Sequence, residues 1–257
     1  MDDVTILGAT GMLGSACAKL LPDANTPTRN EFDALKNEPN FSGWVINCIG
    51  AIPQRIFNEE EMQKLNCDFP RKLENRNSRV IQIVTDCVFS GKTGNYSETS
   101  IKDPVDTYGK TKSAGENAKS LKIRCSIIGP DKSNASLFEW VRQQPLNATI
   151  DGYADHFWNG VSTQIFAKLV KGIIDNNFWE NATYHFVPKN FVSKFELVKL
   201  IANRTGRKDL IIVKKNTGNL VNRTLCTVHP RVNQHLWELA GYSQIPTIEE
   251  IVEEITL

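Results

Sequence analysis

Short apolar runs alternate with amphipathic stretches through the first half of the chain. Four apolar runs have the length of buried strands: residues 4–7, 44–49, 80–84 and 123–128. Three amphipathic stretches follow such runs and predict helices: residues 11–21, 58–74 and 108–120. Pro70 is expected to bend or restart the second of these helices. The alternation predicts an α/β fold, a doubly wound parallel sheet of the Rossmann type.

The pattern weakens in two places. Residues 23–29, where such a sheet needs its second strand, are short and polar, so only a weak strand is expected there. After Gly129-Pro130 the regularity drops, and residues 131–160 are expected to be a loop-rich insertion. Further expected elements are helices at 161–174 and 194–205, strands at 183–187 and 210–213, and an acidic C-terminal helix. We therefore predict a nucleotide-binding domain formed by residues 1–130 with 161–183, and a small C-terminal lobe formed by 131–160 with 184–257.

Composition excludes some classes of partner. The chain has 257 residues, of which 40% are hydrophobic and 23% charged, as in ordinary globular proteins. Its net charge of +1 gives no reason to expect nucleic acid or an anionic membrane as partner. No signal peptide precedes the first apolar run and no run approaches membrane-spanning length, which predicts a cytoplasmic protein. The six cysteines are scattered and form no metal-ligand spacing, so reduced thiols and no metal site are expected.

The segment Gly8-Ala9-Thr10-Gly11-Met12-Leu13-Gly14 joins the first expected strand to the first helix. Glycine permits a tight turn there and lets backbone N–H groups approach a pyrophosphate at the helix N-terminus. The segment therefore predicts a dinucleotide-binding loop. The alternative is a glycine-rich turn without a ligand.

Two further motifs suggest proton chemistry at a carbonyl group. Tyr108 and Lys112 are four residues apart, which places them on one helix face. The Lys112 ammonium is expected to lower the pKa of Tyr108, which can then protonate a ketone oxygen as hydride reaches the carbon. Thr85 follows a buried strand, at the sheet edge where open α/β sheets bind ligands. Taken singly, an exposed Tyr-Lys pair or a threonine that ends a strand would need no function.

These motifs together resemble a known family. The matching segments are residues 47–51, 85–91, 96–98, 106–116, 124–130 and 158–163, with Asn66 between them. They resemble the extended short-chain dehydrogenases, and within these the dTDP-4-dehydrorhamnose reductases and related sugar-nucleotide reductases. The resemblance covers most of residues 4–200 and becomes weaker towards the C-terminus.

The resemblance implies a role for individual residues. It implies a catalytic triad, in which Lys112 also holds the nicotinamide ribose: Thr85, Tyr108 and Lys112. It implies that the pyrophosphate is bound by Gly8, Thr10, Gly11, Met12 and Leu13. The cofactor cleft would be lined by Gly50, Ala51 and Ile52, and the sugar would face Asp86, Val88, Phe89, Trp158 and Asn159. Arg223 would meet the substrate diphosphate, with a surface arginine as the alternative.

The expected reaction is the reduction of a keto sugar. No acidic residue ends the weak second strand, and Arg29 lies there instead, which favours NADPH over NADH. Dehydratases of this superfamily carry Asp-Glu after the catalytic threonine, whereas here Cys87 follows Asp86. The resemblance thus implies NADPH-dependent reduction of a nucleotide-activated 4-keto-6-deoxyhexose in deoxysugar nucleotide biosynthesis, by a possible homodimer. The alternatives are a sugar-nucleotide epimerase and a non-catalytic, dinucleotide-binding regulatory subunit of another enzyme.

Overall fold

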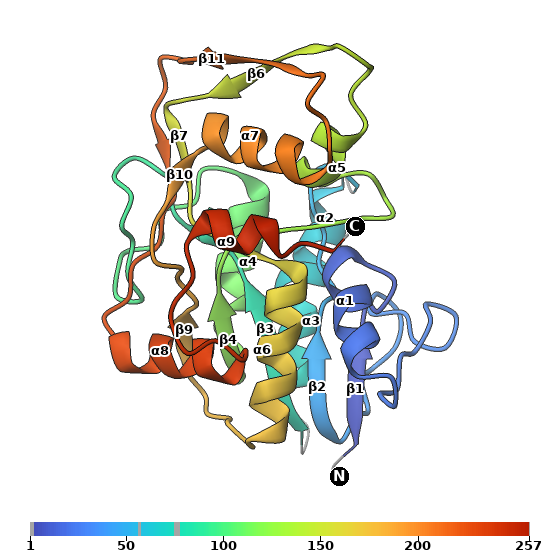
Figure 1. Cartoon of the computed structure of the whole chain (residues 1–257). Coiled ribbons are helices and arrows are strands. Elements are labelled where there is room, and N and C mark those ends of the chain that lie inside the picture. Colours follow the sequence, from blue (N-terminus) through green and yellow to red (C-terminus); the bar gives the residue numbers. More distant parts are fainter. Residues whose placement is uncertain (1–2, 56–57, 75–77, 257) are drawn as a thin grey trace.

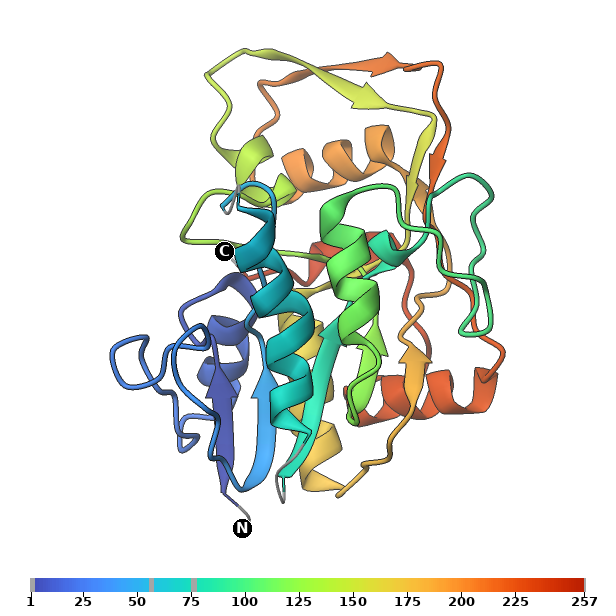
Figure 2. The same ribbon diagram turned by 180° about the vertical axis from the view of Figure 1, so that it is seen from behind.

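A five-stranded parallel sheet forms the centre of the protein. The computed structural model describes residues 3–55, 58–74 and 78–256 (Figure 1). The strand order is β1-β2-β3-β4-β9, from β1 (Val4–Leu7), β2 (Gly43–Asn47), β3 (Ser78–Val84), β4 (Leu121–Arg124) and β9 (Thr183–His185). One face is covered by α1 (Met12–Leu20) and α6 (Thr163–Asp175), as Figure 1 shows. The other is covered by α2 (Glu59–Gln63), α3 (Phe69–Leu73) and α4 (Thr107–Gly115), which lie in front in Figure 2.

Both faces of the sheet are buried, and the apolar run in the middle of β2 shows how one strand serves both. In β2, Trp44 and Ile46 pack into the large cluster on the α1 and α6 side. Val45, between them, joins Phe69 and Leu73 in a separate cluster on the opposite side. Successive side chains of a strand point to opposite faces, so one continuous apolar run fills two cores.

The strand expected at residues 23–29 is reduced to a single β-bridge. The backbone of Asn25 accepts a hydrogen bond from Ile6 N (2.8 Å) and donates one to Val4 O (2.8 Å). Thr5 and Asn25 form the only bridge there in the described part of the chain. The weak strand expected at residues 23–29 is thereby confirmed, and the adenine side of the sheet is shorter than in a full doubly wound fold.

The helix expected at 58–74 is interrupted by a wider turn. Between α2 and α3 lies a π-helical segment, η1 (Lys64–Asp68), and Pro70 lies in the first turn of α3. A proline cannot donate to the carbonyl four residues earlier, so a local change of helix type at this point follows from the sequence. The helix expected at 108–120 ends at Gly115, after which Glu116 turns inward and pairs with Arg124 at 2.5 Å.

The lobe above the sheet is more regular than its sequence indicates. Residues 131–160 hold α5 (Leu137–Arg142), β6 (Thr149–Tyr153) and β7 (His156–Trp158), so the expectation of a loop-rich insertion was wrong. β6 pairs with β11 (Ile211–Lys215), and β7 lies between β10 (Val192–Ser193) and β12 (Val221–Asn222). The helix α7 (Lys194–Arg204) lies beneath the two-stranded ribbon of β6 and β11 (Figure 1).

The C-terminal segment returns from the lobe to the sheet. The helix α8 (Pro230–Leu239), which the sequence pattern did not predict, packs against α6 and β9. The helix α9 (Ile248–Glu253) packs against α7 and against β8 (Val161–Ser162), which pairs with β5 (Ile127–Ile128). The strand expected at 123–128 is therefore two strands, β4 and β5. All six cysteines are free thiols, and no helix of the described residues is long and apolar enough to cross a bilayer.

Candidate active site

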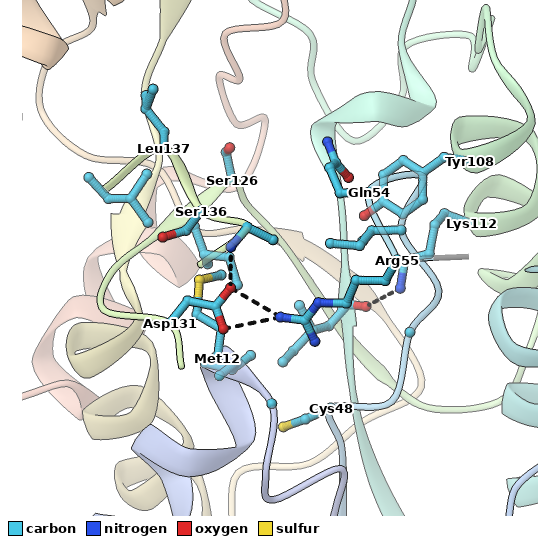
Figure 3. A pocket seen from close by; sticks show the side chains of 18 of the residues that line it. Met12, Cys48, Gln54, Arg55, Tyr108, Lys112, Ser126, Asp131, Ser136 and Leu137 are labelled. Carbon is cyan, nitrogen blue, oxygen red and sulfur yellow. Dashed lines mark hydrogen bonds and ion pairs between the residues drawn. The ribbon is translucent and has the colours of Figure 1, made fainter. Parts of the chain in front are cut away.

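A cavity of about 350 Å³ lies at the carboxyl ends of the central strands, against the lobe. Eight residues that the sequence singled out line it: Gly11, Met12, Leu13, Gly50, Ile52, Tyr108, Lys112 and Trp158. Figure 3 shows part of this wall, with Tyr108 and Lys112 on one side and Met12 below. Open parallel sheets bind ligands at this edge, so the cavity is the candidate active site.

The turn after β1 is shaped to receive phosphate. Gly8 has φ +78°, a left-handed conformation that favours glycine. A Cβ on Gly14 would overlap the carbonyl oxygen of Gly8, so the first turn of α1 packs directly on this loop. The N-cap of α1 is Gly11, and no side chain caps the helix. The first N–H groups of α1 therefore lack a side-chain acceptor and fit a dinucleotide pyrophosphate. Gly8 and Thr10 shape the turn and are not among the residues lining the cavity.

The loop after β2 is fixed by one buried amide. Asn66, in the π-helical segment, accepts a hydrogen bond from Ala51 N (2.9 Å) and donates to Ala51 O (2.9 Å). Its amide nitrogen also donates to the Thr111 hydroxyl of α4 at 3.2 Å. Gly50 and Ile52 line the cavity, as predicted. Ala51 does not line it: its side chain is buried, and its backbone anchors the loop through Asn66.

Two residues of the expected catalytic triad, Tyr108 and Lys112, line the cavity, and Thr85 lies close to Tyr108 without being among the lining residues. Asp106 caps α4 by accepting from Gly109 N at 2.7 Å, which fixes the helix start beside Tyr108. Lys112 extends from the next turn and donates to Ile83 O of β3 at 3.2 Å. Thr85 follows β3 directly, and its hydroxyl is close enough to the Tyr108 phenol to influence the pKa of Tyr108. The sequence thus placed all three on the correct elements.

Burial controls the protonation of this group. It lowers the pKa of Lys112 to about 8, and the nearby Glu116 opposes that shift. Burial raises the pKa of Tyr108, the neighbouring Cys87 raises it further, and the Thr85 hydrogen bond opposes this. The expectation that the pKa of Tyr108 is lowered was therefore wrong for this structure, because burial is the largest cause of the shift and raises the pKa.

The segment after Thr85 holds two buried anchors and Asp86, which is partly exposed but is not among the residues lining the cavity. Asp86 accepts a hydrogen bond from the Thr85 hydroxyl at 3.1 Å. Val88 and Phe89 are completely buried, and the ring of Phe89 stacks on Tyr96 with centroids 4.4 Å apart. Side chains without exposed surface cannot face a sugar. The expectation for Val88 and Phe89 is corrected accordingly: these residues support the segment from behind.

Two residues from distant parts of the lobe also differ in role. The Asn159 amide donates to Leu225 O (2.7 Å) and accepts from Leu225 N (2.9 Å), so both its ends are used within the protein. This side chain fastens two lobe segments together and does not line the cavity, contrary to expectation. Trp158 does line it, and its indole N–H donates to the Ser126 hydroxyl at 2.8 Å.

Arg223 is held beside the active-site segment. Its guanidinium donates to Phe89 O at 3.0 Å and lies 3.9 Å from the sulfur of Cys87. This partly buried position disfavours the alternative of a solvated surface arginine. Arg29 lies elsewhere, with a 73% exposed side chain paired to Asp33 at 3.3 Å, in a shallow hollow away from the catalytic group.

Three charged cavity residues were missed by the sequence reasoning. Arg55, from the loop after β2, binds both carboxylate oxygens of Asp131 at 3.0 and 3.1 Å across the cavity (Figure 3). Lys194, the first residue of α7, lines the cavity beside Trp158. The sequence Ser193-Lys194-Phe195-Glu196 is a readable helix-capping signal, but it does not show that the helix starts at a cavity. No group of three or more potential metal ligands occurs among the described residues.

Residues 1–231 match the family model described as the RmlD substrate binding domain. The chain belongs to this family. It is 25% identical to a dTDP-4-dehydrorhamnose reductase of Aggregatibacter actinomycetemcomitans over 225 residues, 76% of each chain. It is 28% identical to a dTDP-4-keto-6-deoxy-D-glucose reductase of Streptomyces niveus over 230 residues, 80% of this chain and 79% of the relative.

The fold is shared with solved members of the family. The crystal structure of dTDP-4-dehydrorhamnose reductase from Bacillus anthracis in complex with NADP has a TM-score of 0.80 to this chain, at 20% identity. The match covers 99% of this chain and 98% of that one. The predicted Rossmann-type α/β fold and the predicted family are thereby confirmed.

Proposed function

We propose that this protein reduces the keto group of a nucleotide-activated 4-keto-6-deoxyhexose with NADPH, for the synthesis of a deoxysugar nucleotide. The observation that carries the proposal is that Tyr108 and Lys112 line one cavity with the uncapped N-terminus of α1, with Thr85 close to the Tyr108 side chain. The relatives named as reductases of dTDP-linked sugars support dTDP as the nucleotide. A homodimer and a cytoplasmic location stay predictions.

The cofactor would be held by the sheet domain. Backbone N–H groups of Met12 and Leu13 would bind its pyrophosphate, Gly50 leaves room above the ribose, and Lys112 would hold the ribose hydroxyls. Arg29 would bind the phosphate on the adenosine ribose that distinguishes NADPH from NADH. When bound, the cofactor supplies hydride to the carbonyl carbon of the sugar.

Tyr108 is the proposed proton donor. Its raised pKa keeps the phenol protonated at neutral pH, so a proton is available for the carbonyl oxygen. The Thr85 hydroxyl would orient the phenol and would also donate a hydrogen bond to the carbonyl oxygen of the sugar. Lys112, with a pKa of about 8, is mostly charged at neutral pH and stabilises the phenolate that proton transfer leaves behind.

The sugar would lie between the sheet and the lobe. Trp158 offers an apolar surface, Asp86 offers a carboxylate, and Arg223 offers a charge for the diphosphate. We assign β9 and α8 to the cofactor side, because both pack in the sheet domain, and residues 131–160 and 186–228 to the substrate side.

The proposal is tested by the loss of nicotinamide absorbance. NADPH and NADH are each mixed with the protein and a panel of 4-keto-6-deoxy sugar nucleotides that differ in base. Oxidation of NADPH with one panel member, faster than oxidation of NADH, is the expected result. NADPH binding without oxidation across the panel would favour a regulatory subunit, and interconversion of sugars without net oxidation would favour an epimerase.

A further inference from the structure

Lys194 lines the active-site cavity, and its ammonium group has no hydrogen-bond acceptor among the described residues. Ser193 and Glu196 engage each other in a capping box, so the nearest carboxylate on α7 is already bound. The Lys194 ammonium lies 5.5 Å from the centre of the Trp158 ring. Lys194 lines the same cavity as Tyr108.

This position is electrostatically unfavourable for a lysine in the free protein. A cation at the first residue of a helix lies at the positive end of the helix dipole. Burial lowers the pKa of Lys194 to about 8, Arg223 acts in the same direction, and Asp86 and Cys87 oppose the shift. A desolvated ammonium with unfilled donors is normally compensated by a bound acceptor.

Asp86 is the complementary group. One of its carboxylate oxygens accepts from the Thr85 hydroxyl at 3.1 Å, and the same oxygen lies 3.8 Å from the Cys87 sulfur. The second oxygen accepts no hydrogen bond from a side chain among the residues that the structure describes. Burial raises the pKa of Asp86, while Arg223 and Lys194 oppose that shift. Lys194 and Asp86 each influence the pKa of the other, so the two opposite charges lie in the same region without forming an ion pair with each other.

We propose that Lys194 and Asp86 together bind two neighbouring hydroxyl groups of the sugar ring, and that Lys194 thereby determines sugar specificity. Lys194 donates to one sugar oxygen and Asp86 accepts from the adjacent hydroxyl, while the flat Trp158 ring lies along the C–H surface of the sugar. A diphosphate fits this pair less well, because the Asp86 carboxylate would repel it. The inference rests on the proposed function only in taking a sugar nucleotide as the ligand.

Calorimetric binding tests the proposal without requiring turnover. The protein loaded with NADP⁺ is titrated with dTDP-rhamnose and, separately, with dTDP. A charged hydrogen bond to a sugar oxygen predicts that Lys194→Met weakens dTDP-rhamnose binding roughly 10- to 100-fold and changes dTDP binding less than about twofold. Lys199→Met, which removes an exposed lysine of the same helix, is expected to change neither affinity.

Sugars lacking one hydroxyl give a second measurement. The wild type should bind the 2-deoxy or the 3-deoxy analogue more weakly, and Lys194→Met should no longer distinguish that analogue from the full sugar. Equal losses for dTDP-rhamnose and dTDP would overturn the proposal in favour of a diphosphate contact. Unchanged binding of both ligands, or a wild type that does not prefer dTDP-rhamnose to dTDP, would also overturn it. If the wild type binds dTDP-rhamnose more tightly than dTDP and loses this preference in Lys194→Met, but does not oxidise NADPH, only the proposed reduction would be contradicted.

Discussion

The side chain of Asn66 connects the loop after β2 to the helix that carries Tyr108 and Lys112. Its amide makes two hydrogen bonds of 2.9 Å to the backbone of Ala51 and one of 3.2 Å to Thr111. Asn66→Ala removes all three. The Thr111 hydroxyl keeps its bond to Tyr108 O at 3.0 Å, but the N–H and C=O of the fully buried Ala51 lose their partners.

The expected cost follows from these two orphaned groups. A buried backbone group without a partner costs roughly 1–3 kcal/mol, so the two groups together should lower the free energy of unfolding of Asn66→Ala by about 2–6 kcal/mol. The loss is measured by urea denaturation, followed by circular dichroism. The loosened loop lines the cofactor cavity, so the KM for NADPH should also rise.

Asn117→Ala is the matched control. Asn117 is exposed just beyond α4, and its replacement should change stability by less than about 0.5 kcal/mol. A stability loss below about 1 kcal/mol for Asn66→Ala would refute the assignment of Asn66 as the anchor of this loop.

Three further predictions concern the cofactor loop, the buried histidine and cofactor choice. Gly14→Ala pushes a methyl group into the carbonyl of Gly8, and the resulting shift of the phosphate loop should weaken NADPH binding at least about tenfold in a fluorescence titration. Burial and the charge of Arg124 lower the pKa of His185 from 6.5 to about 4, so the unfolded state binds the extra proton between these values. As the pH is lowered from 6 to 5, the free energy of unfolding should therefore fall by about 1 kcal/mol. A free energy of unfolding that stays constant over this range would contradict the burial of His185 as a neutral ring. Arg29→Ala should raise the KM for NADPH several-fold and leave that for NADH unchanged; equal effects on both would exclude a ribose-phosphate contact.

The sequence was sufficient for the fold class and for the elements that carry Thr85, Tyr108 and Lys112. Each motif followed an element with a strong local pattern: a glycine turn after an apolar strand, Thr85 after β3, and Tyr108 just after the Asp106 cap. Such positions are decided by neighbours in the chain. The short second strand was also readable, because its residues are polar.

The lobe could not be read in the same way. In β6 the buried positions are Ile150 and Gly152, so the expected apolar alternation is hidden by a glycine. That glycine is required because the ring of Phe195 from α7 lies against it. Nor does sequence distance show that Lys194 lies beside Asp86, or that the side chain of Asn159 is consumed by Leu225. These are tertiary contacts between segments with no common local pattern.

The most direct test of the account is the turnover rate of Tyr108→Phe with NADPH and the sugar nucleotide that the wild type reduces. Removal of the proton donor predicts a fall in kcat of at least about 100-fold, with both ligands still bound. Tyr153→Phe, which changes a tyrosine on the outer ribbon of the lobe, should retain wild-type turnover. A Tyr108→Phe protein with kcat within about threefold of the wild type would contradict the assignment of Tyr108 as the proton donor.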